Sequence, residues 1–281
     1  MTETHPKAVT RYAEMAAIQP LRQRLRAPLR DLAIRLLSLK AGRPARGAIH
    51  FPYYHHVFQD ERRGFDRQLR WMRDRGEFAS LDQALELLGT AEPLDGCYFC
   101  ITFDDGFETC HSGALPILAD HAAPAAFFVV TGMIGKNADD PADLKDLLSF
   151  YDHGRLLVPF MDWDQVRALH RAGMTIGSHT TKHLHLADAT PEEISEDLIA
   201  SKKAIEAELG QPCRHFCCPW GQPDIDFRTD RDPKLAEGAG FESFLTTARG
   251  ANRPGTSAFA IRRDHVLANW GAHQLSYFFQ G

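Results

Sequence analysis

The feature that most constrains the fold is an apolar run, residues 97–103, that ends abruptly on Asp104-Asp105-Gly106. A short apolar run bounded by turn residues is typical of a buried strand. Carboxylates are costly to bury unless they are paired, hydrogen-bonded or bound to a metal. We therefore predict that the end of this strand is the mouth of a functional site.

A second polar cluster contains His179 and His183 and follows another apolar run, residues 174–176. One Asp and two His form a ligand set for a catalytic divalent metal with positions left open, and the other Asp is then free to act as a base. Either motif alone is weak, because Asp pairs often cap turns and His pairs at this spacing occur by chance. Both motifs at strand ends favour an active site.

From residue 48 onward, predicted strands alternate with predicted helices, which favours a parallel sheet or barrel. The strands are expected at 48–54, 97–103, 125–130, 174–177, 214–218 and 243–246, and the helices at 65–75, 81–88, 113–121, 144–150, 163–172, 191–209 and 232–240. Residues 135–159 break this rhythm. We interpret them as an insertion near the site, such as a substrate lid.

Four stretches resemble motifs of the polysaccharide deacetylases, carbohydrate esterase family 4. Residues 102–106 and 179–183 are similar to the first two signature motifs, and residues 216–221 to the third. Residues 54–57 resemble an N-terminal motif of the subgroup whose barrel is circularly permuted. The resemblance covers residues 48–281. It implies an α/β fold, a distorted (β/α)7 barrel whose C-terminal strand ends carry the chemistry.

The resemblance also implies roles for the motif residues. Asp105, His179 and His183 would hold one divalent metal ion, which we expect to be zinc, and Asp104 would be the general base. Such an ion lowers the pKa of bound water and polarises an amide oxygen. The implied reaction is hydrolysis of an amide.

Further roles rest on the same resemblance. The backbone N–H of Trp220 would stabilise the oxyanion, and the side chains of Trp220 and Trp163 would contact the substrate. His55 would be the general acid, because the pKa of a histidine lies near working pH. His56 is expected to point to the other face of the strand, and His185 to lie outside the ligand set.

The chain departs from the family pattern within the third motif. Many members carry there an Arg that orients the base, whereas this chain has Cys217. Arg214 or Arg263 could supply the charge instead, and the sequence does not decide between them. Cys218 also replaces the usual Tyr.

Residues 1–47 are predicted to form an N-terminal extension, and residues 48–281 the catalytic domain. Between residues 21 and 46 there are many Arg and Lys residues and a single acid, Asp31. We expect Pro28 to begin a helix. Apolar positions recur at helical spacing, namely Leu21, Leu25, Leu29, Leu32, Leu36 and Leu39. Such a segment either makes peripheral contact with an anionic membrane or a partner, or packs one face on the barrel and exposes its arginines.

Composition limits the other possibilities. The net charge is −5, so no global basic field suggests a nucleic-acid partner. Residues 1–20 lack the apolar core of a signal peptide, so we expect a cytoplasmic protein, peripheral at the inner membrane if residues 21–46 bind lipid. The six cysteines fit free thiols, because Cys97 and Cys100 would point to opposite faces of a strand.

Three functions remain open at this stage. The first is a metal-dependent hydrolase that removes N-acetyl groups from an amino-sugar glycan or glycan precursor, with a role in the cell envelope. The second is a hydrolase of a small non-sugar amide or imide, which would need a small closed pocket rather than a spacious groove. The third is a non-catalytic carbohydrate-binding protein, which would have no need for a free base beside a metal.

Overall fold

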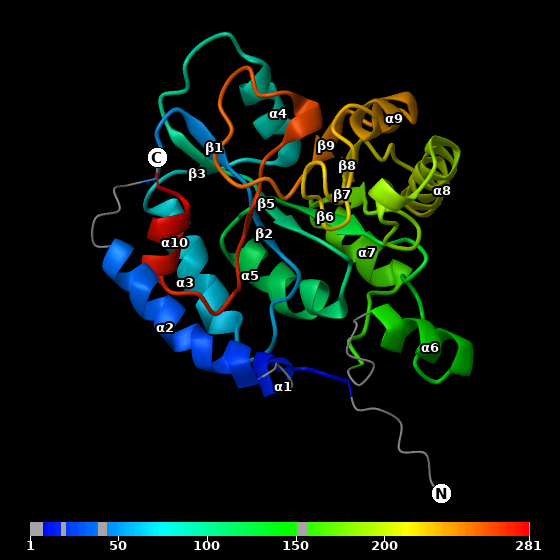
Figure 1. Cartoon of the computed structure of the whole chain (residues 1–281), viewed down its shortest axis with the longest axis horizontal. Coiled ribbons are helices and arrows are strands. Elements are labelled where there is room, and N and C mark those ends of the chain that lie inside the picture. The colour runs from blue at the N-terminus through cyan, green and yellow to red at the C-terminus, as the bar shows by residue number, and fades with distance from the viewer. Residues whose placement is uncertain (1–7, 18–20, 39–43, 151–156, 281) are drawn as a thin grey trace, which may run out of the picture.

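The computed structural model describes residues 8–17, 21–38, 44–150 and 157–280, with side chains of residues 21–29 left out. Figure 1 shows strands at the centre of the molecule with helices around them. Position 39 of the predicted apolar pattern lies outside the described residues. No helix among the described residues combines the length and apolar character that crossing a bilayer requires.

The core of the fold is a parallel seven-stranded sheet of order β10-β2-β5-β6-β7-β8-β9. A smaller parallel sheet has the order β1-β4-β3. The strands are β1 Ala48–His50, β2 Pro52–Tyr54, β3 Glu77–Phe78, β4 Cys97–Phe99, β5 Ile101–Phe103, β6 Ala125–Val129, β7 Thr175–Ser178, β8 His215–Cys217, β9 Ser243–Leu245 and β10 Asp264–His265. The predicted α/β fold, a distorted (β/α)7 barrel, is confirmed in the form of this curled parallel seven-stranded sheet.

Two predicted strands are each divided between the two sheets. The run 48–54 forms β1 and β2, and the run 97–103 forms β4 and β5, with breaks at Phe51 and Cys100. The chain crosses from one sheet to the other there, and the N–H of Cys100 donates to the carbonyl of His50 at 2.9 Å. The prediction of continuous strands was wrong because an apolar run does not show where a strand changes its partners.

Helices cover the sheet and mostly match the predicted positions. They are α1 Tyr12–Ala17, α2 Leu21–Ser38, α3 Arg62–Arg73, α4 Leu81–Gly89, α5 Leu115–Asp120, α6 Pro141–Phe150, α7 Trp163–Arg171, α8 Pro191–Leu209, α9 Asp232–Gly238 and α10 Ala272–Phe278. The bounds of α8 are those predicted, with a capping box formed by Thr190 and Glu193. The helix expected over 113–121 instead begins with a π-helical turn, Cys110–Ala114, before α5.

The N-terminal helix α2 begins at Leu21 and continues through Pro28. The prediction that Pro28 starts a helix was therefore wrong. An internal proline removes one backbone donor and crowds the preceding turn, a local cost that tertiary packing can offset. Here α2 lies along α10, and the ring of His273 is 2.7 Å from the carboxylate of Asp31.

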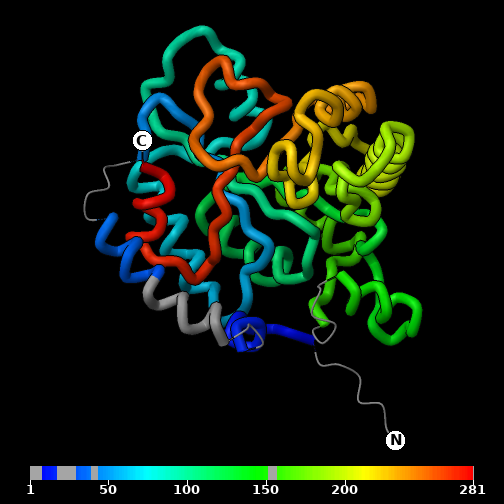
Figure 2. Tube along the Cα trace, viewed as in Figure 1, coloured from blue at the N-terminus to red at the C-terminus, as the bar shows by residue number. Residues whose placement is uncertain are grey.

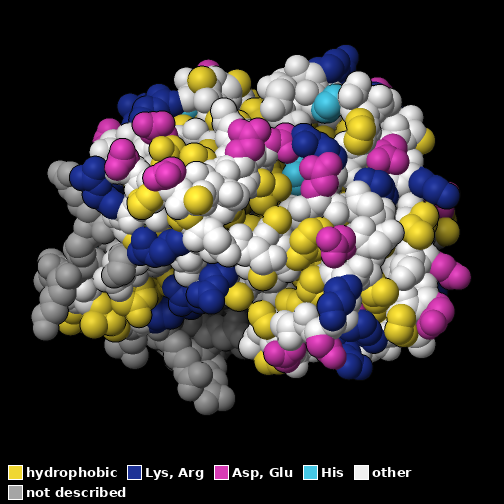
Figure 3. All heavy atoms as spheres, turned by 90° about the horizontal axis from the view of Figure 1, so that it is seen from above, with side chains coloured by type: hydrophobic (Ala, Val, Ile, Leu, Met, Phe, Trp, Pro, Cys, Tyr) yellow, Lys and Arg dark blue, Asp and Glu magenta, His cyan; other side chains and the backbone are white. Residues whose placement is uncertain are grey.

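Distant parts of the chain meet at the edge of the large sheet. Figure 2 shows the last segment of the trace running beside the segment that contains β2, and β10 pairs in parallel with β2. This pairing places residues 262–270 beside the carboxyl ends of the central strands. On the face in Figure 3, acidic and basic side chains are interspersed, without a broad field of one sign.

Candidate active site

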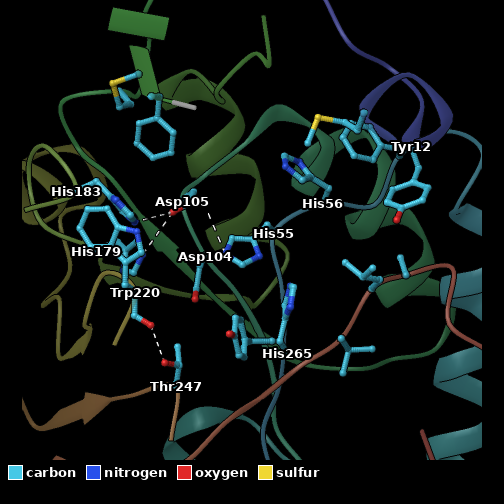
Figure 4. A pocket seen from close by; sticks show the side chains of 18 of the residues that line it. Tyr12, His55, His56, Asp104, Asp105, His179, His183, Trp220, Thr247 and His265 are labelled. Atoms are coloured by element: carbon cyan, nitrogen blue, oxygen red, sulfur yellow. Dashed lines mark hydrogen bonds and ion pairs between the residues drawn. The ribbon is translucent and has the colours of Figure 1, made fainter. Parts of the chain in front are cut away.

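A cleft of about 1700 Å³ lies over the carboxyl ends of the sheet strands. Figure 4 shows that Asp104, Asp105, His179, His183 and His55 converge within it. Asp104 and Asp105 directly follow β5, and His179 follows β7. Because β5 and β7 both pair in parallel with β6, their carboxyl ends meet at one edge of the sheet. The sheet topology thus brings the two sequence motifs together.

Asp105, His179 and His183 form the candidate metal centre. The Nε2 atoms of both histidines lie 3.4 Å from Oδ1 of Asp105, and one ligand atom from each residue falls within 4.8 Å of the others. That Oδ1 is buried and has no hydrogen-bond partner among the described residues. A buried oxygen without a donor fits a carboxylate that binds a cation, so these three residues suit a divalent metal.

The backbone around this centre is unusual. Asp105, Thr180, His183 and Trp220 all have positive φ, between 53° and 72°. Residues other than glycine rarely occupy this region, and such conformations cluster at functional sites where the surrounding structure enforces them. The conformation at Asp105 turns the chain out of β5 so that the two adjacent carboxylates serve different partners.

Supporting contacts fix the orientation of the histidines. Nδ1–H of His179 donates to the carbonyl of Cys217 at 2.7 Å, which directs Nε2 toward Asp105. The N–H of Leu184 donates to the hydroxyl of Thr180 at 2.9 Å and closes the loop between the two histidines. Burial lowers the pKa of His183 to about 4, so its ring is neutral and able to bind a metal at neutral pH.

Asp104 is held by a fully buried arginine from the C-terminal part of the chain. Nη1 and Nη2 of Arg263 donate to the two carboxylate oxygens of Asp104 at 2.7 and 2.8 Å. Arg263 also donates through Nε to the carbonyl of Thr246 at 2.9 Å, and its guanidinium lies 4.5 Å from the ring centre of Tyr53. Burial alone would raise the pKa of Asp104, but the charge and hydrogen bonds of Arg263 hold that pKa below its ordinary value.

The structure therefore resolves which arginine accompanies Cys217. The Sγ atom of Cys217 lies 2.8 Å from Nη2 of Arg263 and 3.6 Å from Asp104. Arg214, the other candidate, pairs with Asp82 at 2.5 Å and lies outside the cleft. Asp104, His179 and Cys217 are also close enough to form a second ligand set. That set suits a metal poorly, because Arg263 occupies Asp104 and burial raises the pKa of the Cys217 thiol.

Asp105 is ionised despite its burial. Burial would raise its pKa, but a hydrogen bond from the His179 ring and the neighbouring His55 and His183 hold the pKa well below its ordinary value. His55 lies on the open side of the cleft, with Nε2 4.0 Å from Oδ2 of Asp105. Its ring packs edge-on against the ring of His265, with centres 5.1 Å apart.

His56 occupies a different environment from its neighbour. Its ring stacks on Phe58 and contacts Phe107, with centres 4.6 and 4.3 Å apart. Its Nδ1 lies 3.1 Å from the hydroxyl of Thr109. Burial lowers the pKa of His56 to about 3. The two histidines thus have different neighbours, but both line the cleft, and β2 ends at Tyr54, so the expectation that His56 points to the other face of a continuing strand is not borne out.

Trp220 forms part of the cleft wall beside the candidate metal centre. The side chain is half exposed, and its ring centre lies 4.2 Å from that of His183. Its carbonyl accepts a hydrogen bond from the hydroxyl of Thr247 at 2.6 Å, while its N–H donates to no described protein acceptor. His185 lies outside the ligand set. It pairs with Asp188 and Asp226 and packs edge-on against Trp220.

The predicted insertion 135–159 contributes to the cleft. Lys136, Asp146 and Phe150 line it, and the Phe150 ring centre lies 5.1 Å from that of His183. Trp163, predicted to contact the substrate, begins α7, packs against the hydrophobic core and is not among the lining residues. The structure gives its predicted binding role no support.

Several lining residues carried no signal in the sequence. Tyr53 and His265 face each other across the β2–β10 pair, with ring centres 4.9 Å apart. Tyr12 of α1 lies at the opposite end of the cleft, and Met15 of the same helix also lines it. These side chains join the cleft through contacts between segments far apart in the sequence.

The comparisons with known proteins agree with this arrangement. The polysaccharide deacetylase family model matches residues 92–239, just over half of the chain. The chain belongs to the polysaccharide deacetylase family.

Individual relatives are more distant. YxkH of Bacillus subtilis is 26% identical over 204 residues, which span 72% of this chain but only 63% of that protein's length. The poly-β-1,6-N-acetyl-D-glucosamine N-deacetylase of Staphylococcus aureus is 23% identical over 224 residues, covering 75% of this chain and 71% of the enzyme.

Two solved structures share the fold. IcaB from Ammonifex degensii superposes with a TM-score of 0.68 at 22% identity, covering 83% of this chain and 97% of that one. The deacetylase PplD of Streptococcus pyogenes, solved with acetate, gives a TM-score of 0.66 at 21% identity, covering 85% and 100%.

Proposed function

We propose that this protein is a metal-dependent hydrolase that removes N-acetyl groups from an amino-sugar glycan or glycan precursor. The observation that carries the proposal is the pair of adjacent carboxylates with separate partners. Asp105 faces two histidines with an oxygen that no described donor contacts, and Asp104 is clamped by Arg263. A binding protein has no need for both arrangements.

The residues that would hold the metal are Asp105, His179 and His183, and we propose zinc because a mixed oxygen and nitrogen set suits it. When bound, the ion supplies Lewis-acid activation of a water nucleophile and of the amide oxygen. The pKa values of Asp105 and His183 are both lowered, so Asp105 is charged and His183 is neutral at neutral pH. These are the protonation states that metal binding requires.

Asp104 would accept the proton of the attacking water. Its lowered pKa keeps it ionised at neutral pH, and the bidentate contact with Arg263 leaves its carboxylate in one orientation. His55 would donate a proton to the leaving amine, because it lines the cleft on the other side of Asp105. The N–H of Trp220, which contacts no acceptor in the described part of the chain, would stabilise the oxyanion.

The size of the cleft favours a glycan over a small amide. Its volume of about 1700 Å³ exceeds the roughly 300–1,000 Å³ typical of pockets for small molecules. Trp220 and Phe150 offer aromatic surface beside the candidate metal centre. The name of the Staphylococcus aureus relative states that it acts on poly-β-1,6-N-acetyl-D-glucosamine, and a β-linked N-acetylglucosamine oligomer is therefore our first substrate to test.

We also propose that the protein belongs to the circularly permuted subgroup of the family. We further propose that it is cytoplasmic and has a role in the cell envelope. The subgroup assignment is supported by His55 at the end of β2, because this strand precedes the Asp motif in the chain and pairs with β5.

Acetate release from N-acetylglucosamine oligomers, measured with metal-loaded and chelator-treated protein, tests the proposal. We expect release that depends on the metal and increases with oligomer length. Hydrolysis of small imides but not of oligomers would favour the second enzyme function, and oligomer binding without acetate release at any metal loading would favour a carbohydrate-binding protein.

A further inference from the structure

The last two turns of α2 expose an apolar surface. Leu32, Leu36 and Leu37 are 55%, 59% and 52% exposed. Among the described side chains, the other exposed large hydrophobic ones are Ile199 on α8 and Trp220 and Ile225 in the loop between β8 and α9. Half of this exposed apolar set is therefore gathered on one short stretch of helix.

Leu32 and Leu36 lie away from the side by which α2 packs on the domain, whereas Leu37 is about 60° around the helix from that side. Ile34 is buried, and Asp31 contacts His273 of α10. At about 100° per residue, Leu32 and Leu36 fall about 40° apart and on the side of the helix opposite Ile34. The leucine pattern noticed in the sequence thus faces solvent where side chains are described, and the helix is already anchored without it.

Positive charge surrounds these leucines. Residues 21–46 contain eight Arg and Lys residues and one acid, and that acid, Asp31, is engaged by His273 and by Arg35. Arg30 and Arg35 are exposed on the same helix. Exposed leucines with flanking arginines match the boundary between headgroups and acyl chains of an anionic bilayer.

The same helix borders the candidate active site. Arg30 lines the cleft together with Tyr12 and Met15 of α1. Figure 4 places Tyr12 at the end of the cleft opposite the Asp–His cluster. Leu32 follows Arg30 by two residues and therefore points to another side of α2, so a surface that covers the leucines would lie along the helix that borders this end of the cleft and not over the cleft itself.

We infer that α2 docks on the surface of an anionic bilayer. Leu32, Leu36 and Leu37 would enter the headgroup boundary while the arginines contact lipid phosphates. Docking would hold the α1–α2 end of the cleft near the membrane surface, where a substrate carried on a lipid could reach it. The lipid-borne substrate rests on the proposed deacetylase function, whereas the docking itself does not.

Vesicle co-sedimentation of the full chain tests the docking. We expect binding to phosphatidylcholine vesicles that contain one quarter phosphatidylglycerol, weaker binding as salt rises, and little binding to phosphatidylcholine alone. The double variant Leu32→Ser/Leu36→Ser should lower the partition coefficient at least tenfold. Arg35→Gln should lower it about fivefold.

Matched controls are available on other helices. Ile199→Ser removes an exposed apolar side chain from α8, and Arg70→Gln removes an arginine of α3 that pairs with Asp66 four residues away, as Arg35 pairs with Asp31. Both should bind vesicles like the original protein. Point variants are preferable to a deletion, because Val9 is part of the hydrophobic core.

Three results would overturn the inference. The unaltered chain could remain in the supernatant at low salt, or the control variants could lose as much binding as the α2 variants. Sedimentation equilibrium without vesicles could instead show a dimer that Leu32→Ser/Leu36→Ser dissociates, which would assign the surface to a second copy. Acetate release from a soluble oligomer is measured in parallel, so that failed docking and failed hydrolysis are told apart.

Discussion

We predict that the contact between Arg263 and Asp104 is needed both for stability and for the charge of Asp104. Arg263 is fully buried, and it donates to both oxygens of Asp104, to the carbonyl of Thr246 and to the hydroxyl of Thr102. Arg263→Gln removes the charge and leaves Asp104 buried without an ionic partner. Arg263→Lys retains the charge but loses the bidentate geometry.

The size of the effect follows from burial. Removing one partner of a buried ion pair typically costs about 3–5 kcal/mol, which for a domain of this size corresponds to a fall in Tm on the order of 5–15 °C. Arg263 lowers the pKa of Asp104, so its loss raises that pKa. Asp104 acts as a base only when ionised, and the acidic limb of the kcat/KM profile should therefore move to higher pH.

The assay combines calorimetry, metal analysis and pH–rate profiles of acetate release. Arg263→Gln should lose Tm, shift the acidic limb upward and retain its metal, with Arg263→Lys intermediate in each. Arg167→Gln is the control, because this arginine is partly exposed and pairs with Asp164 and Glu208 on the surface, where about 0–1 kcal/mol is expected. If Arg263→Gln melted within 1 °C of the original protein and kept its profile, the assignment of Arg263 would be refuted.

The remaining predictions concern the individual roles. Asp104→Asn should keep the metal and lose about 10²–10⁴-fold in kcat; loss of metal with activity per bound ion retained would exchange the roles of the two aspartates. His179→Ala should lower the metal content found by elemental analysis, and equal content in both proteins would reject the ligand set. His55→Ala should lower kcat and flatten the alkaline limb of the pH–rate profile, whereas His56→Ala should do much less; the reverse order would move the acid role. The fold should lose stability as pH falls from about 6.5 toward 4, because unfolded His56 gains a proton there while the folded residue, with a pKa of about 3, does not. Denaturant midpoints measured across this range check the last point, and His56→Gln should show a shallower slope.

The sequence predicted the centre of the candidate site well because its parts follow strands. Asp105 and His179 each lie within three residues of the end of an apolar run, and parallel strands bring such positions to one edge of the sheet. Only sheet order and local turns had to be right for these side chains to meet. The breaks at Phe51 and Cys100 did not affect the predicted site, because β2 and β5, the second halves of the two divided strands, still end at the edge of the sheet where the site lies.

The walls of the cleft could not be predicted in the same way. Tyr12, Phe150 and His265 reach it from α1, α6 and β10, and their positions depend on tertiary packing rather than on any local pattern. The leucine spacing in α2 predicted a helix, but spacing alone does not say which side faces the domain. Among the α2 side chains that the structure describes, Ile34, which is outside that pattern, is the buried one.

The substitution at Cys217 and the position of Arg263 belong together. Arg263 is the residue before β10. Its guanidinium lies between Asp104 and the Cys217 sulfur, with Nη2 2.8 Å from Oδ2 of Asp104 and 2.8 Å from Sγ of Cys217. A second arginine at position 217 would bring like charge into a buried space that already contains one guanidinium, which is costly. A small apolar thiol, kept neutral by its raised pKa, instead leaves room for Arg263 to approach from the C-terminal segment. Asp104 thus keeps a cationic partner, Arg263, although the third motif has Cys217 in place of an arginine. The carboxylate requires a positive charge at hydrogen-bonding distance, and that charge can come from any part of the sequence.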